Sequence, residues 1–230
     1  MKSEKVTKRP KGEDKKRYDD ACGLAHAMEL IGERWAMLVI RELAYGPRRF
    51  SGLKADLPGI SANVLTQRLA ELEQRGIVRK TRLPPPASVQ VYEATGWGLQ
   101  VAPLIGALGK WAARSPLHNP NQPMSHVSVM MSLQTLLSPE RARGLDARVG
   151  FRFGPVEYVA TLAGGHLGVE RTQATDCAVT FSGTSNEIAA VIHGGAPFET
   201  ITVEGDLALA RRFVTLFPLP AKVEAAAQTL

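Results

Sequence analysis

Residues 50–76 read FSGLKADLPGISANVLTQRLAELEQRG, and this stretch decides the fold of the first half of the chain. The turn Leu57-Pro58-Gly59-Ile60 separates a short helical segment from a longer one, and Ser61 is well suited to cap the longer one. Leucines recur along the longer segment at three- and four-residue spacing, and Gly76 can end it in a left-handed conformation. A short helix, a glycine turn and a capped longer helix predict a helix-turn-helix over about 50–75.

The segments on either side extend this motif into a complete small domain. Two amphipathic segments at about 20–31 and 34–45 predict preceding helices. Residues 77–83 and 89–95 are rich in β-branched and basic residues, which favours two short strands. Three consecutive prolines at 84–86 are too stiff for a tight turn and indicate a protruding loop. The sequence therefore predicts a winged helix.

A further helix is expected over about 95–115, after the domain is complete. It keeps an apolar stripe that needs a partner, and a second copy of the same chain is the natural candidate. The residues predicted for this dimer contact are Leu104, Ile105, Leu108 and Trp111.

Charge is distributed unevenly along the chain. Up to Ser115 there are 20 Lys and Arg residues against 12 Asp and Glu, whereas the remainder has 8 against 10. The excess positive charge in the first part favours a polyanionic partner there. Residues 1–18 are strongly basic and almost without apolar side chains, so we expect a disordered basic arm, with a solubilising tail as the alternative.

The second half is expected to form a separate α+β domain over 126–230. Prolines and asparagines at 116–125 indicate a linker between it and the domain at 19–115. Helices are expected near 127–137, 185–193 and after 206, and strand-like segments occur at 147–153, 157–163, 166–171, 177–181 and 200–203. Because strands and helices are mixed, the predicted fold class is α+β.

The face of the 61–75 helix opposite its leucines is polar and uncharged. Asn63, Thr66 and Gln67 lie on or beside it, and Ala70 leaves room for close approach. Asn and Gln can pair bidentately with adenine, so this face suits base edges in double-stranded DNA. With Ser61 at the start of the helix, these are the predicted base-reading residues.

Basic residues beside this face are candidates for phosphate contacts. They are Arg48, Arg49, Arg68, Arg79, Lys80 and Arg82. Arg68 lies on the flank of the helix near the core, where a structural ion pair is an equal alternative. The alternative for the whole set is a solvated polar helix beside a charged hairpin.

Residues 19–115 resemble the HxlR-type winged-helix regulators. The segments that carry the resemblance are Cys22, LIGERW at 30–35, IREL at 40–43, GPRRF at 46–50, LPGIS at 57–61, LTQRL at 65–69, Glu71-Leu72, YEAT at 92–95 and Trp97-Gly98. This resemblance implies a homodimer joined through terminal helices, with one recognition helix for each DNA half-site.

The second half resembles sterol-carrier-protein-type domains. The similar segments are 150–154 with Tyr158, CAVTFSG at 177–183 and VEGDLALA at 203–210. The resemblance implies a five-stranded sheet with helices that enclose an apolar tunnel for a lipid or hydrophobic small molecule. Candidate lining residues are Phe151, Phe153, Phe198, Ile201, Phe213 and Phe217, although composition alone favours a plain core for them.

Cys22 is a candidate redox residue. A thiol in the first turn of a helix has its pKa lowered by backbone N–H groups, although Asp19 and Asp20 oppose this effect. Some regulators that this chain resembles use a cysteine at the matching position as a sensor. Control by thiol modification at Cys22, with a purely structural C-terminal domain, is therefore the alternative to control by an apolar effector. A buried apolar role is the alternative for Cys22 itself, and Cys177 is expected in the core.

Other classes of protein are disfavoured. The five histidines show no metal-ligand spacing, and no nucleophile-elbow or phosphate-loop pattern occurs, so we expect no enzyme, metal or cofactor. No apolar run reaches the roughly 18–20 residues of a membrane span. We expect a cytoplasmic protein without a membrane partner.

Overall fold

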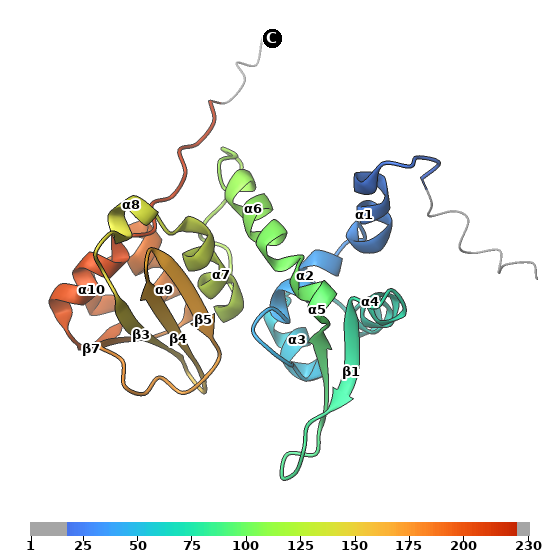
Figure 1. The fold of residues 1–230 in the computed structure, drawn as a ribbon, viewed down its shortest axis with the longest axis horizontal. Helices are drawn as coiled ribbons and strands as arrows, with labels where there is room; N and C mark the ends of the chain where they lie inside the picture. Colours follow the sequence, from blue (N-terminus) through green and yellow to red (C-terminus); the bar gives the residue numbers. More distant parts are fainter. Residues whose placement is uncertain (1–17, 225–230) are drawn as a thin grey trace, which may run out of the picture.

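Two units lie side by side in the computed structural model, which describes residues 18–224 (Figure 1). The first is mainly helical with a two-stranded hairpin, and the second contains a five-stranded sheet. The predicted α+β fold class is confirmed. Apart from Tyr18, the predicted basic arm at 1–18 lies outside the described residues. No helix in the described part of the chain is long and apolar enough to span a bilayer.

The first unit follows the predicted order of elements. It contains α1 (Gly23–Ile31), α2 (Ala36–Glu42), α3 (Phe50–Asp56), α4 (Ala62–Gln74), β1 (Val78–Arg82), β2 (Gln90–Ala94), α5 (Gly96–Leu99) and α6 (Ala102–Ala112). Helices α3 and α4 form the helix-turn-helix. Gly59 adopts a φ of +88° in the turn between them, a conformation that side chains with a Cβ rarely adopt. The Ser61 hydroxyl accepts a hydrogen bond of 3.2 Å from the Val64 amide and so caps α4.

The hairpin packs onto this unit as a wing. Strands β1 and β2 are antiparallel, with Val78 opposite Ala94 and Arg82 opposite Gln90. The backbone of Arg48 adds a short bridge to Tyr92, with two hydrogen bonds of 2.8 Å, which ties the start of α3 to the wing. The predicted winged helix is thus present.

The helix expected over 95–115 is divided into α5 and α6. Pro103 lies at the start of α6 and has no amide hydrogen to donate to the carbonyl of Leu99, where α5 ends. Helix α6 contacts α2 of the first unit on one side and packs against α7 of the second unit on the other (Figure 1).

The second unit contains one sheet with helices on one face. Its elements are α7 (His126–Leu136), α8 (Pro139–Ala142), β3 (Ala147–Phe153), β4 (Val156–Ala163), β5 (His166–Glu170), β6 (Val179–Ser182), α9 (Ser185–Gly194), the 3-10 helix η2 (Phe198–Thr200), β7 (Thr202–Gly205) and α10 (Leu207–Val214). The strand order is β5-β4-β3-β6-β7, with β3 and β6 parallel and the other pairs antiparallel. The sequence predicted all five strands but neither α8 nor η2.

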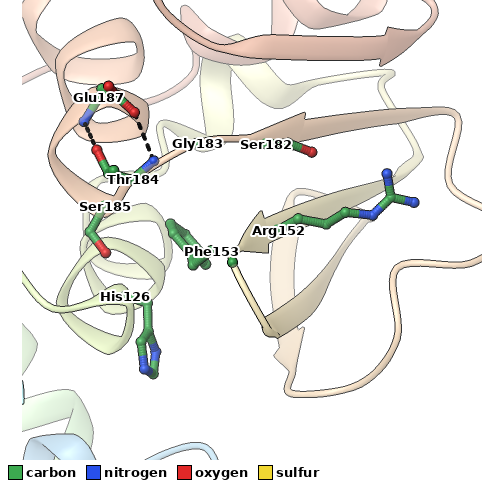
Figure 2. Close-up of a pocket in the computed structure, with 9 residues that line it drawn as sticks. His126, Arg152, Phe153, Ser182, Gly183, Thr184, Ser185 and Glu187 are labelled. Atoms are coloured by element: carbon green, nitrogen blue, oxygen red, sulfur yellow. Dashed lines mark hydrogen bonds between the residues drawn. The ribbon is translucent and has the colours of Figure 1, made fainter.

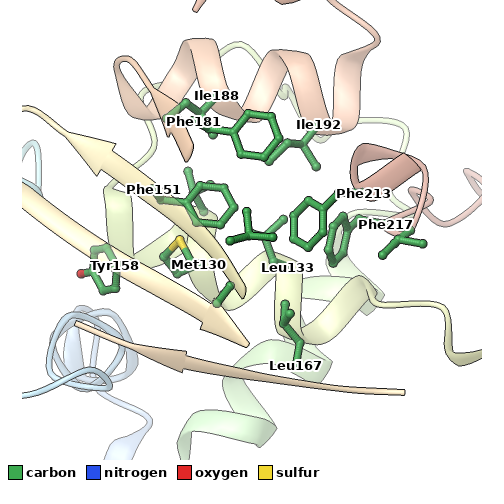
Figure 3. Packing of buried hydrophobic residues seen from close by; sticks show 14 of the residues in the cluster. Met130, Leu133, Phe151, Tyr158, Leu167, Phe181, Ile188, Ile192, Phe213 and Phe217 are labelled. Atoms are coloured by element: carbon green, nitrogen blue, oxygen red, sulfur yellow. The ribbon is translucent and has the colours of Figure 1, made fainter. Parts of the chain in front are cut away.

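The core of the second unit lies between this sheet and helices α7, α9 and α10 (Figure 3). Alternation along β3 sends Phe151 and Phe153 into the core, and Arg152 to the opposite face. Phe213 of α10 meets the Phe151 ring, with 6.2 Å between the ring centroids, and Phe217 packs against Phe213. The second unit therefore has a hydrophobic core of its own, separate from the core of the first unit.

Candidate nucleic-acid interface

The outward face of α4 carries uncharged polar side chains that are open to solvent. Asn63, Thr66 and Gln67 are exposed, and so are Ala70 and Gln74 further along the same helix. The leucines on the opposite face are at most 1% exposed and hold the helix against the core. The helix therefore presents the predicted base-reading residues to the surface.

Local hydrogen bonds orient two of these side chains. The Thr66 hydroxyl donates to the Ala62 carbonyl at 2.9 Å, and the Gln67 amide donates to Glu71 Oε1 at 3.0 Å. Both bonds lie at the surface, where water competes, so exchanging the Gln67 bond for a base contact carries a small net cost. The Ser61 hydroxyl caps α4 and lies at the N-terminal end of the helix.

Arg68 takes the structural alternative of the two that the sequence left open. Its side chain is 7% exposed and forms ion pairs with Glu71 and, at 3.7 Å, with Glu33. The guanidinium therefore links α4 to the segment that follows α1.

Arg48 is placed differently from the sequence-based expectation. Its side chain is 7% exposed, forms an ion pair with Asp56, and has Nη1 3.4 Å from His126 Nε2 in the second unit. The carboxylates of Asp56 and of the buried Glu42 draw the guanidinium inward. A phosphate contact requires an exposed side chain, so we leave Arg48 out of the proposed DNA-facing set.

The remaining basic candidates are exposed at the start of α3 and on the wing. Arg49 precedes α3, and Lys80 and Arg82 lie on β1. Arg79 is 67% exposed and its Nε lies 2.7 Å from Glu93 Oε1 on the neighbouring strand. A surface pair of this kind stabilises the fold little, so Arg79 can exchange it for a phosphate.

The apolar side chains of α6 divide between two environments. Ile105 packs against the core of the first unit, whereas Leu104, Leu108 and Trp111 are 61%, 48% and 72% exposed. Helix α1 is similar, since none of its residues is buried and Leu24 is 67% exposed. Helices α1 and α6 thus both leave apolar faces uncovered, which is typical of an interface.

The aromatic candidates of the second unit are packed against one another. Phe151, Phe213 and Phe217 are at most 2% exposed, and the Phe213 and Phe217 ring centroids are 4.9 Å apart (Figure 3). Phe198 and Ile201 are partly buried at the rim of the same cluster. In this conformation the candidate lining residues form a filled core.

A shallow cleft of about 670 Å³ opens beside this core (Figure 2). Phe153 contributes to both the cleft and the core, and His126 lies at the cleft edge that faces the first unit. The other lining residues are Arg152, Gly154, Ser182, Gly183, Thr184, Ser185 and Glu187. Glu187 is already engaged with Thr184 in the capping box of α9.

The two cysteines have contrasting surroundings. Cys22 is exposed, and the nearby backbone amides of Leu24 and Ala25 lower the pKa of its thiol. The Asp20 carboxylate accepts a 2.9 Å hydrogen bond from the Cys22 amide. Cys177 lies in the loop before β6, where burial raises its thiol pKa. Within residues 18–224, no group of three or more potential metal ligands comes together.

A polar cluster at the boundary of the two units was not predicted. It contains Glu42 and Asp56 from the first unit, and His126 and Tyr158 from the second, with Arg48 between them. Its members are far apart in the sequence and belong to no motif. The adjacent charged residues Arg41 and Glu42, inside the otherwise apolar segment MLVIRELAYG at 37–46, were the only local signal, and they did not identify a partner.

The first unit matches known proteins. Residues 30–119 match the family model described as HxlR-like helix-turn-helix. The uncharacterized HTH-type transcriptional regulator YvaP of Bacillus subtilis is 37% identical over 86 residues, which span 37% of this chain and 80% of YvaP. The HTH-type transcriptional regulator YodB of the same organism is 36% identical over 86 residues, which span 37% of this chain and 77% of YodB.

A solved structure, the reduced form of YodB from B. subtilis, aligns with a TM-score of 0.38 and 32% identity, and covers 43% of this chain and 97% of that one. The sequence relatives fix the family through the first unit, where α4 exposes its polar face. The chain belongs to the HxlR-like helix-turn-helix family and is a DNA-binding transcriptional regulator.

Proposed function

We propose that this regulator is a homodimer that reads a near-palindromic operator in double-stranded DNA. Each protomer places α4 in one major groove, and the two half-site centres lie one helical turn apart, about 34–36 Å. The observation that carries this proposal is the exposed, uncharged polar face of α4 with Asn63, Thr66 and Gln67.

The side chains around α4 divide into two roles. Asn63, Thr66 and Gln67, with Ser61 at the helix start, contact base edges and determine sequence preference. Arg49, Arg79, Lys80 and Arg82 contact phosphates and fix the position of the duplex without reading its sequence. Arg68 supports α4 from behind through its ion pairs.

The dimer forms through the uncovered faces of α6 and α1. Leu104, Leu108 and Trp111 supply the exposed apolar surface, and aromatic anchors of this kind dominate protein interfaces. Ile105 contributes indirectly, because it anchors α6 to the first unit.

The second unit, at 126–230, is a sterol-carrier-like domain that senses an apolar small molecule or lipid, joined to the DNA-binding domain at 19–115 by the linker at 116–125. The strand order β5-β4-β3-β6-β7, the helices on one face and the aromatic interior support this assignment. Phe153 connects the open cleft to that interior, so a ligand entering there separates rings that are now in contact.

DNA selection tests the central part of the proposal. Full-length protein selects duplexes from a random-sequence pool, and fluorescence anisotropy then compares a selected duplex with a scrambled duplex of equal length and salt. We expect the selected duplex to bind about 10³-fold more tightly or better. Equal affinity for the two duplexes would refute sequence-specific reading.

Ligand binding by the second unit is tested separately. Organic extracts of the purified protein are analysed by mass spectrometry, and a fluorescent long-chain fatty acid is titrated into the stripped protein. Reproducible retention of one apolar compound, or saturable binding of the probe, is expected. Empty extracts together with unsaturable binding contradict a sensing role and leave the domain structural.

Cys22 supports a second candidate for control. Its thiol is exposed and has a lowered pKa, which favours the reactive thiolate. Under this alternative, oxidants or electrophiles modify Cys22 at the N-terminus of α1 and change the dimer. If a Cys22→Ser protein responds to quinones or peroxide as the natural protein does, this candidate is excluded.

A further inference from the structure

Helix α7 is the main contact of the second unit with the first, and it makes this contact near both of its ends. Its first residue, His126, faces α3, and Thr135 near its last turn faces α6. The same helix packs against β5 and α9 and supplies core residues to the second unit. It therefore belongs to the sensing domain while it contacts three helices of the DNA-binding domain, α2, α3 and α6.

The contact at the start of α7 is a buried polar cluster. The His126 ring has Nε2 at 3.3 Å from Asp56 Oδ2 on α3, and Nδ1 at 2.7 Å from the Tyr158 hydroxyl on β4. Burial raises the pKa of Tyr158, so its hydroxyl keeps its proton. One imidazole thus connects α3 to the sheet of the second unit.

The same end of α7 is also tied to α2. The Ser125 hydroxyl caps α7 by accepting from the Ser128 amide at 3.1 Å, and it donates to Glu42 Oε1 at 2.8 Å. Because the Glu42 side chain is fully buried, breaking this contact leaves a carboxylate without a partner from the second unit.

The contact near the end of α7 is steric. A Cβ built on Gly106 of α6 stands closer than 3.0 Å to the Thr135 hydroxyl, a distance that real Cβ atoms do not show. The hydroxyl is held in place, because it donates to the Met131 carbonyl at 2.8 Å. Only glycine at 106 allows α6 and α7 to approach this closely.

We propose that α7 is the positioning element of the regulator. Its His126 contacts Asp56 of α3 and its Thr135 contacts Gly106 of α6, so α7 fixes the angle between the helix-turn-helix and the helix that forms the dimer. The inference rests on the proposed function, because that angle matters only if α6 joins two protomers and α4 reads DNA. The distance between the two recognition helices then depends on how α7 is seated.

In this arrangement, a movement of the second unit changes the position of the helices that contact DNA. His126 lines the cleft beside Phe153 and also bonds Asp56, so displacement at the cleft edge moves a residue that holds α3. A shift of α7 alters the position of α6 at the same time. Both changes alter the fit to two half-sites while the base-reading face of α4 stays intact.

The steric contact between Gly106 and Thr135 can be tested with one disruptive substitution and a second substitution that compensates for it. Gly106→Ala forces α6 and α7 apart, whereas adding Thr135→Ala removes the hydroxyl and methyl groups and leaves only a Cβ at an ordinary 3.6 Å. Gly109→Ala is the matched control, since it makes the same change on the same helix with no atom within 4 Å. All are made in the full chain, with thermal unfolding and dimer mass recorded.

The measured quantity is the affinity for the selected duplex, and the affinity for the scrambled duplex is measured for comparison. Gly106→Ala is expected to weaken selected-duplex binding roughly 3- to 30-fold with little change on scrambled DNA, and the double variant is expected to recover most of the loss. Gly109→Ala should bind like the natural protein. Unchanged selected-duplex affinity in a Gly106→Ala dimer overturns the proposal, and so does a loss that Thr135→Ala does not repair.

A second pair of variants covers the case in which Gly106→Ala does not fold. His126→Gln and Asp56→Asn act on the other end of α7, and their effects on selected-duplex affinity are measured singly and together. If His126 and Asp56 act through one contact, the double variant should lose no more affinity for the selected duplex than the single variant with the larger loss. Independent, additive losses, or no loss, overturn the role of His126. If the natural protein prefers no duplex, the proposed function itself has failed instead.

Discussion

His126 Nε2 lies 3.3 Å from Asp56 Oδ2, so the first residue of α7 and the last residue of α3 meet across the boundary of the two units. Arg48 binds the same carboxylate, and the buried Glu42 lies behind it. One partly buried site thus contains two carboxylates, a guanidinium and an imidazole. Clusters of this kind depend on all their members, because removing one leaves another charge unpaired.

The pH dependence of stability follows from Asp56. Burial alone raises its pKa, but the hydrogen bonds and charges of His126 and Arg48 outweigh burial and lower the pKa below that of an ordinary Asp side chain. A carboxyl with a lowered pKa stabilises the folded state above its unfolded pKa, and this stabilisation is lost as the pH falls through the folded value. Asp56→Asn is therefore expected to cost roughly 1–3 kcal/mol at neutral pH.

Urea unfolding of the natural protein and of Asp56→Asn, followed from neutral pH into acid, measures this difference. The gap between the two free energies of unfolding should close as Asp56 becomes protonated. A gap that is the same at neutral and acidic pH would show that the cluster contributes no charge-dependent stability.

Arg79 is expected to contribute to DNA affinity without contributing to sequence preference. Arg79→Ala should weaken selected and scrambled duplexes alike and reduce the slope of log affinity against log salt by about one. Anisotropy titrations between about 50 and 200 mM salt measure this slope. Arg171→Ala, an exposed change in the second unit, is the control. A loss confined to the selected duplex would assign Arg79 to base reading instead.

The dimer depends on the exposed face of α6 in our account. Replacing Trp111 by Ala and Leu108 by Glu removes an aromatic anchor and places a charge in the contact, so the protein should become monomeric. Light scattering measures the mass, and Leu117→Glu, at a position that is 91% exposed outside α6, is the control. If the protein with both changes is still a dimer, the interface does not lie on the exposed face of α6.

The two thiols should react at different rates. The amides at the start of α1 lower the pKa of Cys22, whereas burial raises that of Cys177, so at neutral pH Cys22 holds the larger thiolate fraction. Mass spectrometry during iodoacetamide treatment of the native protein should show Cys22 alkylated first. Equal rates, or faster labelling of Cys177, would contradict this assignment.

The DNA-binding domain could be predicted from sequence because its signals are local. Leucine spacing defines the buried face of α4, Ser61 marks its start, and the polar residues between the leucines are then exposed by geometry. The wing follows from a change of periodicity after Gly76. None of these inferences requires knowledge of a distant contact.

The boundary between the units could not be predicted for the opposite reason. Arg48 resembles Arg49 in sequence, yet Asp56 and His126 draw it inward while Arg49 stays exposed. Gly106 reads as an ordinary small residue until Thr135 is placed against it. The aromatic residues of the second unit suit a packed core or the lining of a tunnel. Composition alone does not decide between these roles, because it contains no information on how closely the rings pack.

Gln67→Ala tests the central claim most directly, with Gln100→Ala as an exposed control away from α4. Loss of a base contact should weaken the selected duplex by about 1–3 kcal/mol and leave scrambled DNA and the salt slope unchanged. Selected duplexes altered at single positions should show that the preference is lost at one base pair in each half-site. If Gln67→Ala binds the selected duplex as tightly as the natural protein, or loses affinity for all duplexes equally, α4 is not the reading helix in the way proposed.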